Sequence, residues 1–131
     1  MSKSVEFFDL QFRGQIAAGE FSLNPFEQAV LPHLHGDVLD LGCGIGNLAV
    51  AAARQGCRVT ALDGSAAAVA RLAAVAQADQ LELVAQQADL AQASIHGSYD
   101  AVVAIGLLMF LPRPLSTSML AARLWLNSAM N

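Results

Sequence analysis

The feature that most constrains this chain is a glycine-rich segment, residues 42–46 (Gly-Cys-Gly-Ile-Gly), between an apolar run and an alanine-rich stretch. The apolar run, residues 38–41, is typical of a short buried strand, and residues 46–55 are typical of a helix that Gly56 ends. Glycines allow a sharp turn between the two elements, and they allow a ligand to approach the main chain closely. A helix that begins at such a turn directs free N–H groups toward that ligand. The segment therefore predicts a binding turn between a strand and a helix.

The rest of the chain continues the alternation of strands and helices. A long helix is predicted from the cap residue Ser65 to about residue 78, and a shorter one from Pro25 to about Leu34. The residues before Pro25 are expected to be irregular or partly helical. Further strands are predicted at residues 57–62, 81–84 and 99–105, and a last helix at about 115–127. This order is typical of a doubly wound α/β fold, in which helices lie on both faces of a parallel sheet.

Composition excludes several classes of protein. A chain of 131 residues has the size of one domain, and 55% hydrophobic with 14% charged residues is incompatible with disorder. The net charge of -4 argues against binding nucleic acid or an anionic membrane through broad phosphate contacts. Cys43 and Cys57 are too few for a disulfide framework. The longest uncharged apolar run, residues 101–112, is shorter than the roughly 20 residues of a membrane span, so we expect a cytoplasmic protein.

Two classes of ligand use a glycine turn of this kind. In the dinucleotide fingerprint GxGxxG the third glycine follows the first by five residues. Here Asn47 stands at that position, and the third glycine is Gly46. Asp40, two residues before the first glycine, would repel a diphosphate and suits a ligand with a cationic amine. An NAD-linked oxidoreductase is therefore the less favoured alternative.

Residues 38–46 (VLDLGCGIG) resemble motif I of the class I S-adenosylmethionine-dependent methyltransferases. Asp63, after the second predicted strand, is similar to the acidic residue that binds the ribose hydroxyls in this family. Residues 88–90 (ADL) resemble the segment whose carboxylate binds the adenine amino group, and residues 99–105 (YDAVVAI) resemble the fourth-strand motif. The resemblance covers about residues 24–114. Within the family, residues 24–27 (NPFE) and 105–112 (IGLLMFLP) resemble a small-molecule subgroup that includes the tellurite-resistance enzymes.

This resemblance implies a Rossmann-like domain that binds S-adenosylmethionine, releases S-adenosylhomocysteine and methylates a small molecule. It assigns cofactor binding to Asp40, Gly42, Cys43, Gly44, Gly46, Asp63, Gly64, Ser65, Asp89, Leu90 and Ile105. No catalytic base is predicted, because a base depends on the acceptor. No metal site is predicted either, because His33 and His35 lack neighbouring metal-ligand residues in the sequence.

The family fold has seven strands, and only about four are predicted here, so we expect the N-terminal part of that fold. The expected organisation is a lead-in with one helix at residues 1–35 and an incomplete binding domain at 36–131. An uncovered fourth strand would suit a homodimer. A non-catalytic module that binds S-adenosylmethionine or S-adenosylhomocysteine stays an alternative to an enzyme. The clustered phenylalanines before residue 22 either brace the domain or close over a ligand.

Overall fold

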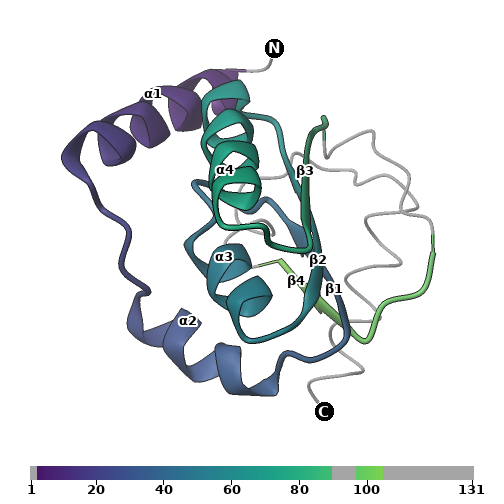
Figure 1. The fold of residues 1–131 in the computed structure, drawn as a ribbon. Helices are drawn as coiled ribbons and strands as arrows, with labels where there is room; N and C mark the ends of the chain where they lie inside the picture. The colour runs from purple at the N-terminus through teal and green to yellow at the C-terminus, as the bar shows by residue number, and fades with distance from the viewer. Residues whose placement is uncertain (1–2, 90–96, 105–131) are drawn as a thin grey trace.

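The computed structural model describes residues 3–89 and 97–104, and its centre is a parallel sheet of four strands (Figure 1). Their order in the sheet is β3-β2-β1-β4. The strands are β1 (Asp37–Leu41), β2 (Arg58–Asp63), β3 (Leu83–Gln87) and β4 (Ala101–Val103). The chain reverses its direction of winding after β3, because β4 pairs with β1 on the side opposite to β2. Ligands of open α/β sheets bind at the carboxyl ends of strands near such a reversal.

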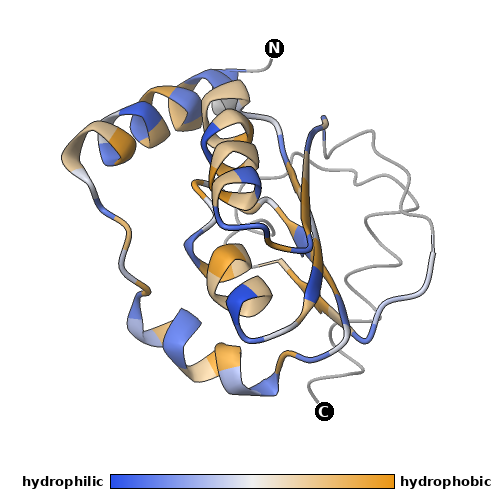
Figure 2. Cartoon of the chain, in the orientation of Figure 1, coloured by the Kyte–Doolittle hydropathy of each residue, from blue (hydrophilic) through white to orange (hydrophobic). Residues whose placement is uncertain are grey.

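The helices of the described part lie outside this sheet. They are α1 (Lys3–Ala18), α2 (Pro25–Val30), the 3-10 turn η1 (Leu31–His33), α3 (Asn47–Arg54) and α4 (Ala66–Ala78). In Figure 1, α3 and α4 cover the same face of the sheet, and α1 crosses near the N-terminal end of α4. Hydrophilic residues interrupt α1 along its whole length, whereas the strands are mainly hydrophobic (Figure 2). The packing of α1 therefore depends on a few specific contacts.

The hydrophobic core follows from the alternation of side chains along the strands. Val38 and Val59, which are register partners on β1 and β2, point to the face that α3 and α4 cover. Leu72 of α4 and Ala52 of α3 are fully buried against that face. The next residue along β1, Leu39, points to the opposite face, where it packs with Tyr99 and Val102 among others. Alanines let the two helices approach the sheet closely.

Two helices begin where the cap residues predict. Ser65 caps α4 by accepting a hydrogen bond from the N–H of Ala68 (3.1 Å). Asn24 and Glu27 form a capping box at the start of α2, with bonds of 2.8 and 3.0 Å. Helix α2 ends at Val30, and the predicted continuation to Leu34 is a 3-10 turn because Pro32 cannot donate to the preceding α-helical turn.

The third and fourth strands differ from their prediction. The third was expected at 81–84 but begins at Leu83, because Leu81 accepts from the N–H of Leu83 in the turn after α4 (2.9 Å). The pairing with β2 then extends β3 to Gln87. The fourth, expected at 99–105, is limited to Ala101–Val103, where it pairs with β1. The predicted helix at 115–127 lies outside the described residues.

Candidate ligand-binding site

The glycine turn lies where β1 ends, beside the end of β2. Because β1 and β2 are parallel and in register from Asp37–Arg58 to Leu41–Leu62, both chains leave the sheet at one edge. We call Asp40, the turn 42–46 and residues 63–65 the strand-end site. Gly42, Gly44 and Gly46 all have positive φ, of 72°, 57° and 85°. A side chain would strain the backbone at each of these positions.

Most of the main-chain N–H groups of the turn are already bonded within the protein. Gly42 and Cys43 donate to the carbonyl of Leu62, at 2.8 and 3.1 Å, and Gly44 donates to Oδ2 of Asp63 at 2.9 Å. These bonds join the turn to the end of β2. Few amides of this turn are left to surround a diphosphate, which a dinucleotide would require.

Asp63 is buried, and each of its carboxylate oxygens accepts one main-chain hydrogen bond. Oδ1 accepts from the N–H of Ser65 at 2.8 Å, and Oδ2 accepts from Gly44. A carboxylate oxygen has a second lone pair, so each can accept one more hydrogen bond. Two backbone bonds thus fix the orientation of a carboxylate that still has capacity for hydroxyl groups.

Asp40 differs from Asp63 because no N–H or O–H group of the described residues donates to its carboxyl group. The residue is only 5% exposed. Burial raises the pKa of Asp40 to about 7, and the negative charges of Asp63 and Glu27 add to this effect. A ligand cation at this carboxyl would supply the missing interaction.

Cys43 contributes to the turn through its backbone. Its thiol donates to the carbonyl of Gly44 at 3.4 Å. Burial, followed by the charges of Asp40 and Asp63, raises the pKa of this thiol. The thiol therefore stays protonated and is a poor nucleophile.

Two residues beside the turn attach it to the segment between α1 and α2. Nδ2 of Asn47 donates to the carbonyls of Glu20 and Ser22 at 3.1 and 3.4 Å, and its Oδ1 is buried without a partner in the described residues. Nη1 of Arg71 on α4 donates to the carbonyl of Ile45 at 2.5 Å, and its guanidinium lies 4.4 Å from the ring centroid of Phe21. These contacts hold residues 20–22 close to the turn.

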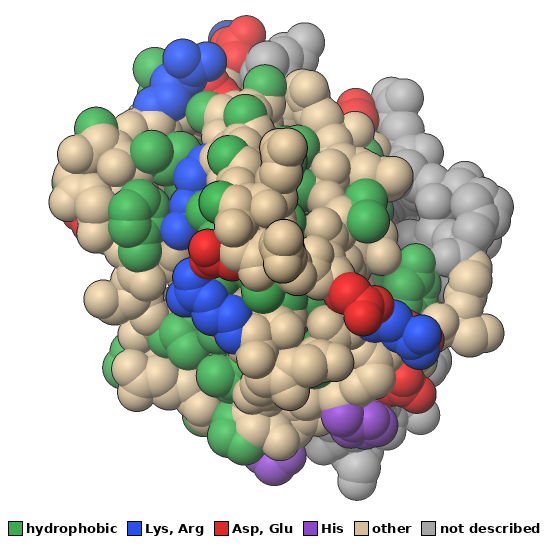
Figure 3. All heavy atoms as spheres, viewed as in Figure 1, with side chains coloured by type: hydrophobic (Ala, Val, Ile, Leu, Met, Phe, Trp, Pro, Cys, Tyr) green, Lys and Arg blue, Asp and Glu red, His purple; other side chains and the backbone are tan. Residues whose placement is uncertain are grey.

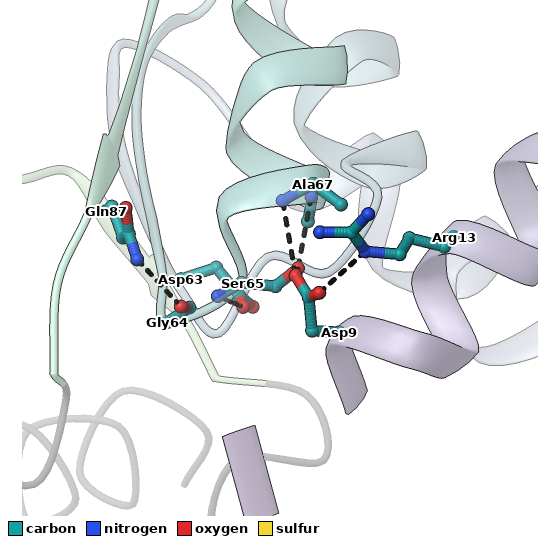
Figure 4. A network of polar contacts seen from close by, with 8 residues as sticks. Asp9, Arg13, Asp63, Gly64, Ser65, Ala67 and Gln87 are labelled. Carbon is teal, nitrogen blue, oxygen red and sulfur yellow. Dashed lines mark hydrogen bonds and ion pairs between the residues drawn. The ribbon is translucent and has the colours of Figure 1, made fainter. Parts of the chain in front are cut away.

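Helix α1 also reaches the strand-end site, which the sequence did not indicate. A Cβ atom at Gly44 would come within 3.3 Å of the Phe12 ring, so this ring lies directly over the turn. Asp9 accepts from the hydroxyl of Ser65 at 2.6 Å (Figure 4). The aromatic cluster was the only signal for Phe12, while Phe7 and Phe21 are 63% and 46% exposed. No local pattern could have identified Asp9, whose partner lies 56 residues away.

The remaining residues that were predicted to bind the cofactor are Gly64, Asp89, Leu90 and Ile105. Gly64 follows Asp63, and its carbonyl accepts from Nε2 of Gln87 at 3.3 Å, which ties the end of β2 to β3 (Figure 4). Asp89 follows β3 at the same edge of the sheet and is exposed. Leu90 and Ile105 lie outside the described residues.

The strand-end site is rich in hydrogen-bond acceptors. The carboxyl groups of Asp40 and Asp63 can accept further hydrogen bonds, whereas most amides of the turn are bonded internally. Such a site suits a ligand with hydroxyl, amino and cationic groups. Over residues 3–89 and 97–104, no three His, Cys, Asp or Glu side chains gather as a metal ion would require. No helix in that part of the chain is long and apolar enough to cross a membrane.

A parallel sheet with this order, a glycine turn after β1 and an acidic residue at the end of β2 form a Rossmann-like domain. The chain belongs to the methyltransferase domain family, whose sequence model matches residues 38–125. This agrees with the resemblance of motif I and confirms the predicted Rossmann-like fold.

Two curated relatives are similar to part of this chain. The ubiquinone biosynthesis O-methyltransferase of Cronobacter sakazakii is 40% identical over 89 residues, which cover 66% of this chain and 37% of that protein. A 23S rRNA uracil C5-methyltransferase of Halomonas elongata is 51% identical over 53 residues, covering 40% of this chain and 11% of that protein. The chain thus spans about a third of the length of the first relative and less of the second.

Two solved structures have the same fold. TehB from Haemophilus influenzae superimposes with a TM-score of 0.67 at 26% identity, over 76% of this chain and 35% of that one. Coclaurine N-methyltransferase, crystallised with N-methylheliamine and SAH, superimposes with a TM-score of 0.54 at 28% identity, over 63% of this chain and 27% of that one.

Proposed function

We propose that the strand-end site binds S-adenosylmethionine and that the chain supplies this methyl donor for transfer to a small-molecule acceptor. The observation that carries the proposal is the excess of acceptors at the ends of β1 and β2, above all the buried carboxyl of Asp40, to which no described group donates. S-adenosylmethionine has an ammonium group, a sulfonium, two ribose hydroxyls and an adenine amino group, all of which such a site favours. A dinucleotide would place its diphosphate at the glycine turn, beside Asp40.

We assign roles from the contacts of each residue. Asp63 would accept the ribose hydroxyls with its remaining lone pairs, and Asp40 would offset the positive charge of the methionyl portion. The turn 42–46, including Cys43, would let the main chain lie against the ligand, and Gly64 and Ser65 would leave room for the adenine edge. Asp89 would bind the adenine amino group, with Leu90 and Ile105 beside it.

The group that S-adenosylmethionine supplies is an electrophilic methyl carbon on a sulfonium. The residues of this chain hold and orient the ligand, so that an acceptor can approach in line. No residue in the described part is assigned as a general base.

A small acceptor is favoured by the distribution of charge. Ion pairs among the described residues, such as Arg13–Asp9, Arg54–Asp79 and Arg58–Asp37, place basic groups beside acidic ones. On the face in Figure 3, basic and acidic side chains are accordingly interspersed. This pattern offers no extended basic surface there for a nucleic acid backbone.

Calorimetry with S-adenosylmethionine, S-adenosylhomocysteine and NAD⁺ tests this proposal. We expect binding of the first two, a loss of about tenfold or more in Asp63→Ala, and no change in the control Asp37→Asn at the exposed start of β1. Binding of NAD⁺ alone, or an unchanged affinity in Asp63→Ala, would contradict the proposal. Binding without methyl transfer to a panel of phenols, amines and thiols would identify a non-catalytic module.

A further inference from the structure

Helix α1 is attached to the first turn of α4 by one buried carboxylate. Oδ1 of Asp9 accepts from the hydroxyl of Ser65 (2.6 Å) and from the N–H of Ala67 (3.2 Å), and its Oδ2 accepts from Nε of Arg13 (2.8 Å) (Figure 4). Asp9 is 9% exposed although it belongs to a helix that is otherwise largely exposed. A side chain of α1 therefore completes the cap of another helix.

The hydrogen bonds continue from this cap into the strand-end site. The hydroxyl of Ser65 donates to Asp9, while the main-chain N–H of Ser65 donates to Oδ1 of Asp63. Oδ2 of Asp63 in turn accepts from Gly44. One uninterrupted chain of bonds thus connects α1 with the carboxylate at the end of β2 and with the glycine turn.

Ser65 has a single hydroxyl proton, and Asp9 determines where it points. Oγ of Ser65 accepts a hydrogen bond from the N–H of Ala68, so the hydroxyl group can still donate its own proton to another acceptor. The 2.6 Å bond to Asp9 directs this proton toward α1, and the Ser65 group that bonds to Asp63 is its main-chain N–H. The lone pairs of Asp63 that the backbone does not use then remain open to a ligand.

The charge of Asp9 suits this place. The hydroxyl of Ser65, then Arg13 and the N–H of Ala67, lower the pKa of Asp9 to about 2. The carboxylate is therefore ionised at neutral pH, and it lies at the positive end of the α4 dipole. The Phe12 ring over Gly44 places the next turn of α1 beside the same site.

We propose that α1 is part of the methyl-donor site and that Asp9 is a positioning residue, which holds Asp63 in its ribose-binding orientation through Ser65. This inference rests on the proposed function. It gives α1, within the expected lead-in at residues 1–35, a role in binding beyond a structural one. It also predicts that the loss of Asp9 affects recognition of the ribose more than recognition of the rest of the ligand.

The test compares S-adenosylhomocysteine with its 2′-deoxy analogue by calorimetry. In Asp9→Ala we expect the affinity for S-adenosylhomocysteine to fall about tenfold and the preference over the 2′-deoxy analogue to fall at least about threefold. Asp9→Asn keeps an acceptor for Ser65 and should recover most of both values. The matched control is Asp79→Asn, which removes an Asp–Arg pair of equal length at the other end of α4.

The possible outcomes separate the two proposals. If the wild type binds S-adenosylhomocysteine but Asp9→Ala weakens both ligands equally, or neither, Asp9 has only a structural role and the inference is wrong. If the wild type does not bind S-adenosylhomocysteine, the proposed function fails and the inference fails with it. Where Asp9→Ala does not fold by circular dichroism, Ser65→Ala decides, because it removes the hydroxyl that donates to Asp9 and keeps the main-chain N–H that donates to Asp63. A preference ratio in Ser65→Ala equal to that of Asp79→Asn and of the wild type contradicts the inference.

Discussion

Asp40 of β1 and Asp63 of β2 point to the same face of the sheet, and the charge of Asp63 adds to burial in raising the pKa of Asp40 to about 7. The shared face follows from the register, in which Asp40 pairs with Ala61, two residues before Asp63. The two carboxyls have different surroundings. Backbone N–H groups bind both oxygens of Asp63, while no described group donates to Asp40. The protein therefore contains a buried acid that titrates near neutral pH.

The first prediction concerns stability between pH 5 and 8. Because the folded state raises the pKa of Asp40, its contribution to stability is complete below the ordinary carboxyl pKa near 4 and is lost as the pH rises through about 7. The free energy of unfolding of the wild type should fall by roughly 1–4 kcal/mol over this interval. Asp40→Asn should remove most of this slope and be the more stable protein at pH 8. Urea unfolding at both pH values measures the effect.

Asp37→Asn is the control for this prediction. Asp37 lies on the same strand, but it is paired with Arg58 (2.7 Å) and partly exposed. We expect this variant to keep the slope of the wild type. If the free energy of unfolding of Asp40→Asn falls with pH as steeply as that of the wild type, groups other than Asp40 cause the pH dependence.

The elements nearest the glycine turn were predictable from sequence because local chemistry determines them. Ser65 begins α4 and the apolar residues 38–41 form most of β1. Local patterns failed where pairing or distant contacts decide the structure. Leu81 is apolar and was predicted as the start of a strand, but β2 pairs only from Leu83 onward. Helix α1 was not predicted as a continuous helix, because it has mixed polarity and its packing depends on Asp9.

The candidate site shows the same division. Asp40, the glycine turn and Asp63 were identified from their positions at the ends of predicted strands, and the structure brings them together. Asp9 and Arg71 were missed, because each contacts the site through a partner more than 20 residues away. Such contacts leave no periodic signal in a single sequence. The assignment of each residue to the ligand stays a prediction.

The second prediction contrasts two glycines. A Cβ atom at Gly46 would lie 2.5 Å from Cδ1 of the buried Leu72, and the φ of +85° is unfavourable for any other residue. Gly46→Ala should therefore lower the free energy of unfolding by roughly 2–5 kcal/mol. Gly14→Ala is the opposite case, because nothing lies within 4 Å of its Cβ position in α1. It should stabilise the protein by about 0.5–1 kcal/mol.

Thermal or urea unfolding of both variants checks this contrast. Gly46→Ala with the stability of the wild type would mean that the turn has a different conformation from the one described. A destabilised Gly14→Ala would mean that the packing of α1 leaves less room at this position.

The third prediction concerns Arg71, which holds the glycine turn and the segment before α2 together. Arg71→Ala removes the bond to the Ile45 carbonyl and the contact with the Phe21 ring. We expect a loss of roughly 1–2 kcal/mol in the free energy of unfolding and faster cleavage after Glu20 by a glutamate-specific protease. Arg54→Ala is the matched control, since it removes an exposed arginine paired with Asp79. Equal cleavage rates in the two variants would show that Arg71 does not restrain this segment.

The last prediction links the titration of Asp40 to the proposed ligand. A cation bound beside Asp40 favours the ionised carboxylate, so binding should lower the pKa of Asp40 from its value of about 7 in the free protein. The affinity for S-adenosylhomocysteine, whose ammonium supplies this charge, should then increase between pH 5.5 and 7.5, by up to about tenfold for each unit by which the pKa falls. Asp40→Asn should bind with an affinity that is nearly independent of pH, whereas Asp37→Asn should behave as the wild type.

Calorimetry in buffers of different ionisation enthalpy also counts the protons released on binding. This number should approach one for each ligand bound near pH 6 and be close to zero in Asp40→Asn. Proton release of equal size in the wild type and in Asp40→Asn would place the ligand cation away from this carboxyl.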